Sequence, residues 1–154
     1  MRWFALPLAV ALATVTCGPS EEEIALAEKA AAAAAEDSLL AAADAAFDAS
    51  VYDTLTYESE EAALERGQQV YTFSCARCHG DQGLGDAEFV HGGETLTPPS
   101  FREATWRMAG DKEAIRKAIF VGTAENMPHW GLEGLKAESV EAVARYIAGG
   151  MGGE

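Results

Sequence analysis

The chain has 154 residues, enough for one compact domain and some additional segments, and its formal net charge is −14 at pH 7. The acidity is uneven: residues 17–66 carry a net charge of −11, whereas residues 67–154 carry only −4. Such a chain argues against a nucleic-acid partner, because binding to phosphates requires clustered cations.

The first segment of the chain predicts export. A positive charge at Arg2 precedes an apolar run over residues 4–15, which is too short to span a bilayer and is typical of a secretory signal. Cys17 follows at once and resembles the cysteine of a bacterial lipoprotein signal, which becomes the lipidated N-terminus. A small-x-small site at residues 11–13 leaves ordinary cleavage without lipid open. We therefore expect residues 1–16 to be a signal peptide of lipoprotein type, and the mature chain to be periplasmic, either lipid-anchored or soluble.

An acidic, alanine-rich segment over residues 17–58 predicts a helical linker. Ser20 and Glu23 fit a capping box, and the following run is dense in alanine, the best helix former. One interpretation is a solvated, semi-rigid spacer that holds the next domain off the membrane. The other is a helix that packs on a partner subunit through four of its apolar side chains. Those side chains would be Leu39, Leu40, Ala43 and Phe47.

Residues 51–59 show no periodicity and are expected to form a hinge, after which a helical pattern leads into Cys75-Ala76-Arg77-Cys78-His79. Two cysteines three residues apart, with a histidine after the second, are the attachment pattern of c-type haem. Positions i, i+3 and i+4 share one helix face, so both sulfurs can reach one porphyrin while His79 lies beneath its iron. The pattern predicts one covalently attached haem c.

Two other uses of the paired cysteines stay open as alternatives. A structural zinc ion needs four nitrogen or sulfur ligands, and the chain has no second paired motif to supply them. A redox-active dithiol would sit where a strand meets a helix, and no convincing strand precedes the motif.

The remainder of the chain predicts further helices and no strand, so the expected fold class is all-α. Asp111 and Ser139 are expected to cap two helices, and Gly149 to end the last one. In chain order the expected elements are a loop over 81–99, a short helix over 104–110, a helix over 111–120, an irregular segment over 122–134 and an amphipathic helix over 139–147.

This order of elements resembles the class I cytochrome c family over about residues 59–150. The closer likeness is to bacterial cytochrome c domains that occur as subunits or partners of respiratory oxidases. The motifs that carry it are Pro-Pro-Ser-Phe at residues 98–101, Trp106, and Gly-Thr-Ala-Glu-Asn-Met-Pro at residues 122–128. The resemblance implies a class I cytochrome c fold, a small helical bundle around one haem, in a domain over residues 59–154.

The resemblance also implies roles for individual residues. Cys75 and Cys78 would hold the haem through thioether bonds, His79 would be the proximal ligand of the iron, and Met127 the distal one. The carbonyl of Pro98 would accept a hydrogen bond from the His79 ring and orient it. The first and last helices would cross where a glycine faces an aromatic ring, a contact that Gly67 and Tyr146 fit. Other side chains that could compete for the iron are Met108, His91 and His129, for which packing or an outward position is the simpler interpretation.

A His/Met ligand pair predicts electron transfer rather than catalysis. Sulfur favours ferrous iron and raises the reduction potential. With both axial positions filled by the protein, no site remains for a substrate, so we expect an electron carrier and not an enzyme. The expected partners are a quinol-oxidising complex and a terminal oxidase or reductase, between which the chain would shuttle. The alternatives are an integral subunit of a larger membrane-bound redox complex, and a haem sensor or peroxidase with a labile Met127.

Overall fold

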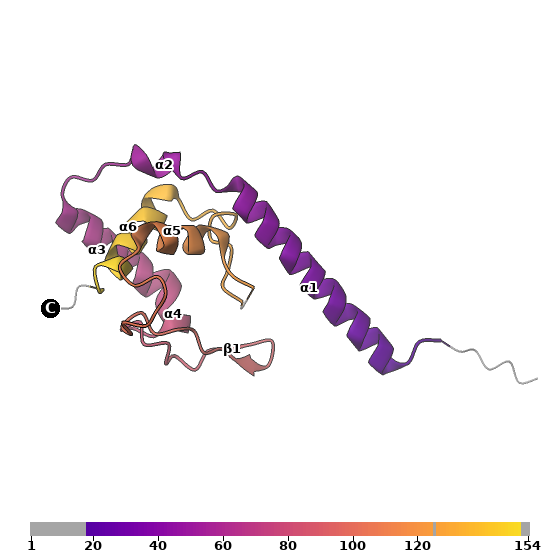
Figure 1. The fold of residues 1–154 in the computed structure, drawn as a ribbon. Helices are drawn as coiled ribbons and strands as arrows, with labels where there is room; N and C mark the ends of the chain where they lie inside the picture. Colours follow the sequence, from indigo (N-terminus) through magenta and orange to yellow (C-terminus); the bar gives the residue numbers. More distant parts are fainter. Residues whose placement is uncertain (1–17, 125, 152–154) are drawn as a thin grey trace, which may run out of the picture. The chain divides into compact units, whose positions relative to one another are not determined.

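The structure is a computed structural model that describes residues 18–124 and 126–151. Within these ranges the chain forms helices joined by turns, with a single two-stranded hairpin, as Figure 1 shows. The predicted all-α class is confirmed. The expected signal peptide and Cys17 lie outside the described residues. Among the helices that the structure does describe, none combines the length and the apolar character needed to cross a membrane.

Helix α1 (Glu21–Ala46) begins with the predicted capping box. The Ser20 amide donates to the Glu23 carboxylate at 2.7 Å, and the Glu23 amide donates to the Ser20 hydroxyl at 3.2 Å. The chain divides into two compact units, Met1–Ala34 and Ala35–Glu154. In the first unit, the side chains that the structure describes are exposed, as a solvated spacer requires.

The part of α1 that belongs to the second unit packs on its own chain. Ala43 is completely buried, and Phe47, just beyond the helix, makes an edge contact with the Phe120 ring at a centroid distance of 5.5 Å. Two of the side chains considered for a partner subunit are thus covered from within the chain. Leu39 remains 46% exposed.

A short helix α2 (Ser50–Asp53) lies at the start of the expected hinge. The helix that carries the cysteine motif follows in three successive parts, of which the first is α3 (Glu60–Val70), with Ser59 as its N-cap. A π-helical segment, η1 (Tyr71–Cys75), then leads into α4 (Ala76–His79), which ends at Gly80 with a φ of 77°. The wider π turn changes the direction in which the following side chains point.

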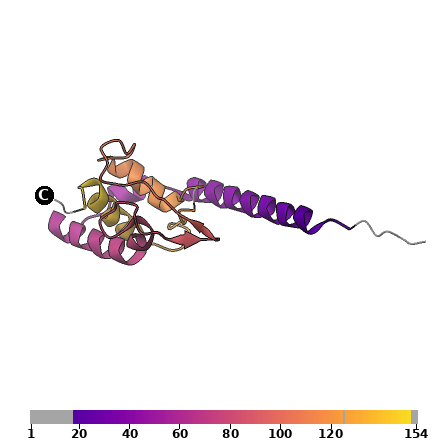
Figure 2. The ribbon, with the colours of Figure 1, turned by 90° about the horizontal axis from the view of Figure 1, so that it is seen from below.

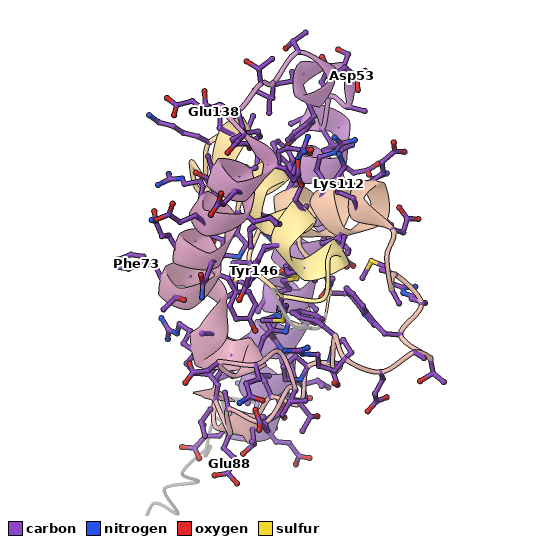
Figure 3. All side chains as sticks on the ribbon, turned by 90° about the vertical axis from the view of Figure 1, so that its left-hand side faces the viewer. Asp53, Phe73, Glu88, Lys112, Glu138 and Tyr146 are labelled. Atoms are coloured by element: carbon purple, nitrogen blue, oxygen red, sulfur yellow. The ribbon has the colours of Figure 1, made fainter. Side chains whose placement is uncertain are left out.

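The core of this unit is the crossing of α3 with α6 (Ala137–Ala148), with α5 (Lys112–Val121) packed on α6, as Figures 1 and 2 show. The predicted contact at the crossing is confirmed. A β-carbon added to Gly67 would lie 2.7 Å from that of Tyr146, so only glycine permits this approach. Figure 3 shows Tyr146 turned toward the inside of the unit, whereas Phe73, on η1, points outward and is 92% exposed.

Three local expectations are corrected by the structure. Residues 104–110 form turns instead of a helix, and helix α6 begins at Ala137, before the expected cap. The Ser139 side chain is buried and accepts a hydrogen bond from Arg66 at 3.0 Å, so tertiary packing uses its hydroxyl. The loop after the cysteine motif contains a hairpin of β1 (Val90–His91) and β2 (Glu94–Thr95), joined by two glycines with positive φ. The predicted Asp111 cap and the Gly149 stop are confirmed.

A buried carboxylate joins α5 to α6. The Glu141 side chain is 1% exposed and accepts hydrogen bonds from Lys112 at 2.8 Å, Arg116 at 3.0 Å and Arg145 at 2.9 Å. Burial alone would raise the pKa of Glu141, but the hydrogen bonds from these cations outweigh it and hold that pKa below its usual value. Arg116 in turn lies over the Tyr52 ring, 4.5 Å from its centroid.

Glu141→Gln is expected to lower the free energy of unfolding by about 3 kcal/mol at pH 7, because Arg116 would stay buried without its counter-charge. The lowered pKa of Glu141 means that the wild type keeps this contribution above about pH 4.5 and loses it as the pH falls through the folded-state value. Urea unfolding of the holoprotein between pH 3 and pH 7 measures both effects. A variant with unchanged stability, or with the same acid dependence as the wild type, would contradict this role.

Candidate functional site

One large cavity collects most of the residues singled out by the sequence. Its volume is about 1390 Å³, larger than the roughly 300–1,000 Å³ of ordinary small-molecule sites. Cys75, Cys78, His79, Pro98 and Met127 all line it, although they come from segments up to 52 positions apart. Much of the remaining lining is apolar or aromatic, including Phe101, Trp106, Ile115, Ile119 and Trp130.

The two cysteines reach the cavity from the end of η1 and from α4. Both are free thiols, Cys75 buried and Cys78 half-buried. Burial, with a smaller contribution from Cys78, raises the pKa of Cys75 to about 12, so this group is a protonated thiol at neutral pH. Two uncharged sulfurs one helical turn apart, both facing an apolar cavity, are suited to covalent bonds with a flat apolar ring.

His79 enters the same cavity one residue after Cys78. Burial lowers the pKa of His79 to about 4, which keeps the imidazole neutral and able to donate a nitrogen lone pair to a metal. The ring stacks on Phe101 at a centroid distance of 4.6 Å. Its Nδ1 atom is buried and has no hydrogen-bond partner among the described residues.

The expected hydrogen bond from the His79 ring to the Pro98 carbonyl is therefore not made in this structure. The Pro98 carbonyl instead lies against Gly85, whose missing side chain leaves room for it. Pro98 still lines the cavity, and its predicted role in orienting His79 remains a prediction. A buried ring nitrogen without a partner is costly, and it fits an imidazole whose environment is completed by a further group.

Met127 is presented to the cavity by a tight loop after α5. The Thr123 amide donates to the Met127 carbonyl at 3.2 Å, and Gly122 has a φ of 80°. A β-carbon at Gly122 would lie 2.6 Å from the Met127 carbonyl oxygen. Asn126 has a φ of 68°, a left-handed conformation that asparagine tolerates better than most residues. The backbone of Met127 is thus held next to the cavity that its side chain lines.

The competing ligands are distributed differently. Met108 and His91 also line the cavity, Met108 from the turns before α5 and His91 from β1. His129 does not line it, and it is buried instead of exposed, with only 7% of its surface accessible. Its Nδ1 donates to the Val121 carbonyl at 2.7 Å. His129 thus lies away from the cavity, as expected of a residue that does not bind the iron, but the expected outward position is wrong because the ring is buried.

Tyr71 also shapes the site, a role that its position in the sequence does not predict. Its side chain is 1% exposed, and its hydroxyl donates to the Gly80 carbonyl at 2.6 Å, directly after His79. This bond ties the end of α4 to the start of η1. The apolar periodicity of the helix marked Tyr71 only as a core position, because the partner of its hydroxyl depends on the π turn.

The arrangement fits a covalently held metal porphyrin. The cavity is large, its wall is apolar, two thiols share one side, and two soft or neutral metal ligands, an imidazole and a thioether, line it as well. The zinc alternative finds no support in residues 18–124 and 126–151, where no three His, Cys, Asp or Glu side chains gather as a metal site.

Comparison with known proteins identifies relatives of the same kind. Residues 62–147, more than half of the chain, match a family described as cytochrome C oxidase, cbb3-type, subunit III. The cbb3-type cytochrome c oxidase subunit FixP of Azorhizobium caulinodans is 32% identical over 85 residues, which are 55% of this chain and 26% of the relative. The cbb3-type subunit CcoP of Cereibacter sphaeroides is 28% identical over 98 residues, 63% of this chain and 31% of the relative.

The CcoP subunit of Azospirillum brasilense is similar at 32% identity over 96 residues, 62% of this chain and 31% of that protein. The chain thus spans less than a third of the length of these curated relatives. No solved structure was found to match it significantly.

Proposed function

Since the chain belongs to the cytochrome c oxidase, cbb3-type, subunit III family, we propose that it is an electron-transfer subunit of a membrane-bound terminal oxidase complex. Membership of this family establishes the class I cytochrome c fold and a covalently bound c-type haem with its iron. The observation that carries the proposal is that Cys75, Cys78, His79 and Met127 line one cavity.

Each of these side chains has a proposed task. Cys75 and Cys78 form the thioether bonds to the haem, and His79 and Met127 are the axial ligands of its iron. The bound haem supplies a one-electron couple. His79 offers a neutral imidazole because burial lowers its pKa, and Met127 offers a thioether on a loop with little conformational freedom. With both positions held by side chains, the chain moves electrons and has no position for a substrate of its own.

The relatives favour a bound subunit over a free shuttle. They carry the names of oxidase subunits, and the expectation of a carrier that moves between complexes has no comparable support. We propose the oxidase as the electron acceptor and a quinol-oxidising complex as the source of electrons further upstream. We also propose an exported domain on the periplasmic side of the membrane, with a lipid anchor at Cys17.

The proposal is tested on the native protein solubilised from its own membranes in mild detergent. We expect the haem-staining polypeptide to co-elute with oxygen-reducing activity. Its intact mass should include one haem and, at Cys17, a diacylglycerol and an acyl chain. Elution as a free haem protein, apart from the oxidase, would contradict the subunit assignment. A mature mass without the lipid would contradict the anchor alone.

A further inference from the structure

Tyr71 bonds to the chain at both ends of the CxxCH motif, residues 75–79. Its main-chain carbonyl accepts a hydrogen bond from the amide of Ala76, which closes the π turn of η1. Its hydroxyl donates to the carbonyl of Gly80 at 2.6 Å, directly after the motif. A single residue ahead of the motif therefore restrains both its beginning and its end.

The bond from the Tyr71 hydroxyl is buried and has a fixed direction. Tyr71 is 1% exposed, Gly80 is buried as well, and the phenol ring packs against the rings of Phe101 and Tyr146. Burial, the largest of several causes, raises the pKa of Tyr71 well above its usual value, so the hydroxyl keeps its proton. Because a carbonyl can only accept, the phenol is the donor at every ordinary pH.

The carbonyl that Tyr71 holds belongs to the residue next to His79. The His79 carbonyl itself accepts a hydrogen bond from the Gly85 amide at 2.8 Å, and the Gly80 carbonyl accepts a second one from the Gly83 amide at 3.1 Å. The Nδ1 atom of the His79 ring, in contrast, has no hydrogen-bond partner among the described residues. The position of the imidazole thus depends on how firmly the adjoining main chain is held.

We propose that Tyr71 is a positioning residue for the proximal ligand His79. Its hydrogen bond to Gly80 restrains the main chain beside His79 to the position in which the imidazole lines the cavity, and so keeps the imidazole on the iron. A bond made in that position stabilises it against positions in which the main chain has moved, which fixes the sign of the effect. The inference rests on the proposed function, because it assumes that His79 binds the haem iron.

Nitric oxide added to the ferrous holoprotein measures how firmly the chain holds His79. The parent for this experiment is Met127→Ala, in which the distal position is open. Nitric oxide bound there weakens the bond on the opposite side of the iron. The protein then divides between a six-coordinate form and a five-coordinate form from which His79 has left, and absorption and EPR spectra distinguish the two.

Tyr71→Phe, added to this parent, is expected to raise the ratio of the five-coordinate to the six-coordinate form. The substitution keeps the packed ring and removes one hydrogen bond, and a bond of ordinary net strength shifts an equilibrium by about two- to tenfold. We expect a change of about threefold, near the lower end of that range, because the Gly80 carbonyl keeps its bond from the Gly83 amide.

Tyr57 supplies a matched control. Its hydroxyl also donates to a main-chain carbonyl, that of Glu138 in α6, and Tyr57 is not among the residues that line the cavity. Tyr57→Phe in the same parent therefore removes the same kind of bond and should leave the ratio unchanged. An unchanged ratio in Tyr71→Phe, or an equal rise in both variants, would overturn the proposal.

A measurement on the wild type tests the bond without any substitution. In the diamagnetic ferrous protein, the Tyr71 hydroxyl proton should exchange slowly enough with water to give an NMR signal with a contact to Gly80. Its absence would also overturn the proposal. An EPR spectrum of the nitric oxide complex of the parent without an imidazole nitrogen opposite nitric oxide would instead overturn the ligation by His79, and the proposal with it.

Discussion

Replacing Met127 with alanine is expected to leave the haem attached but to abolish the weak near-infrared band of methionine-ligated ferric haem. Among the described residues of the loop after α5 that line the cavity, Met127 is the one with a sulfur ligand atom suited to haem iron. Without it the potential should fall by on the order of 0.1 V, a fraction of the roughly 0.8 V over which axial ligands set haem potentials. Absorption spectroscopy and a redox titration measure the two effects.

The same variant distinguishes an electron carrier from a haem sensor or peroxidase. The ferrous wild type should bind almost no carbon monoxide at neutral pH, because Met127 is proposed to fill its distal position, whereas Met127→Ala should bind it readily. Met108→Ala is the matched control, since Met108 lines the same cavity. If the near-infrared band survives in Met127→Ala and disappears in Met108→Ala, the axial ligand is Met108, and its assignment to Met127 is wrong.

Cys78→Ser is expected to remove most of the stable holoprotein. One of the two thioether bonds can no longer form, so the haem would be attached by at most one covalent bond. Any product that still carries haem through Cys75 keeps one vinyl group in conjugation with the porphyrin, so its visible band lies at longer wavelength. Haem staining of the denatured polypeptide measures the loss.

The third cysteine of the chain provides the control for this experiment. Cys17→Ser removes a thiol far from the motif in sequence and should leave haem staining unchanged, although it would remove the proposed site of lipidation. If Cys78→Ser stains fully for haem and its visible absorption band stays at the wild-type wavelength, Cys78 makes no bond to the haem.

Features that depend on neighbouring residues were predictable from the sequence. The Ser20–Glu23 capping box and the Asp111 cap form as expected, because a cap satisfies amides within three residues of itself. The CxxCH spacing places its three side chains at one cavity for the same local reason. Gly67 at the helix crossing was inferred from a family resemblance, and the close approach of Tyr146 shows why it is glycine.

Other local patterns gave the wrong element because longer-range packing decided the outcome. Residues 104–110 have a helical pattern but form turns, in which Trp106 faces the cavity. The Ser139 hydroxyl is a good cap in isolation, yet it bonds to Arg66 on another helix. The hairpin after the cysteine motif consists of strands of only two residues, too short to leave a periodic signal.

The sequence by itself therefore determined the helical class and the covalently bound haem, and it predicted Cys75 and Cys78 as the residues that hold that haem, because these inferences follow from side-chain chemistry and from spacings within one or two helical turns. Only the tertiary structure decided that Glu141 is buried among three cations, that His129 is turned away from the cavity, and that the Glu36 carboxylate contacts His129. Each of these contacts joins residues at least 25 positions apart or depends on which face of a helix is covered, and no local pattern of charge or hydrophobicity records such a pairing.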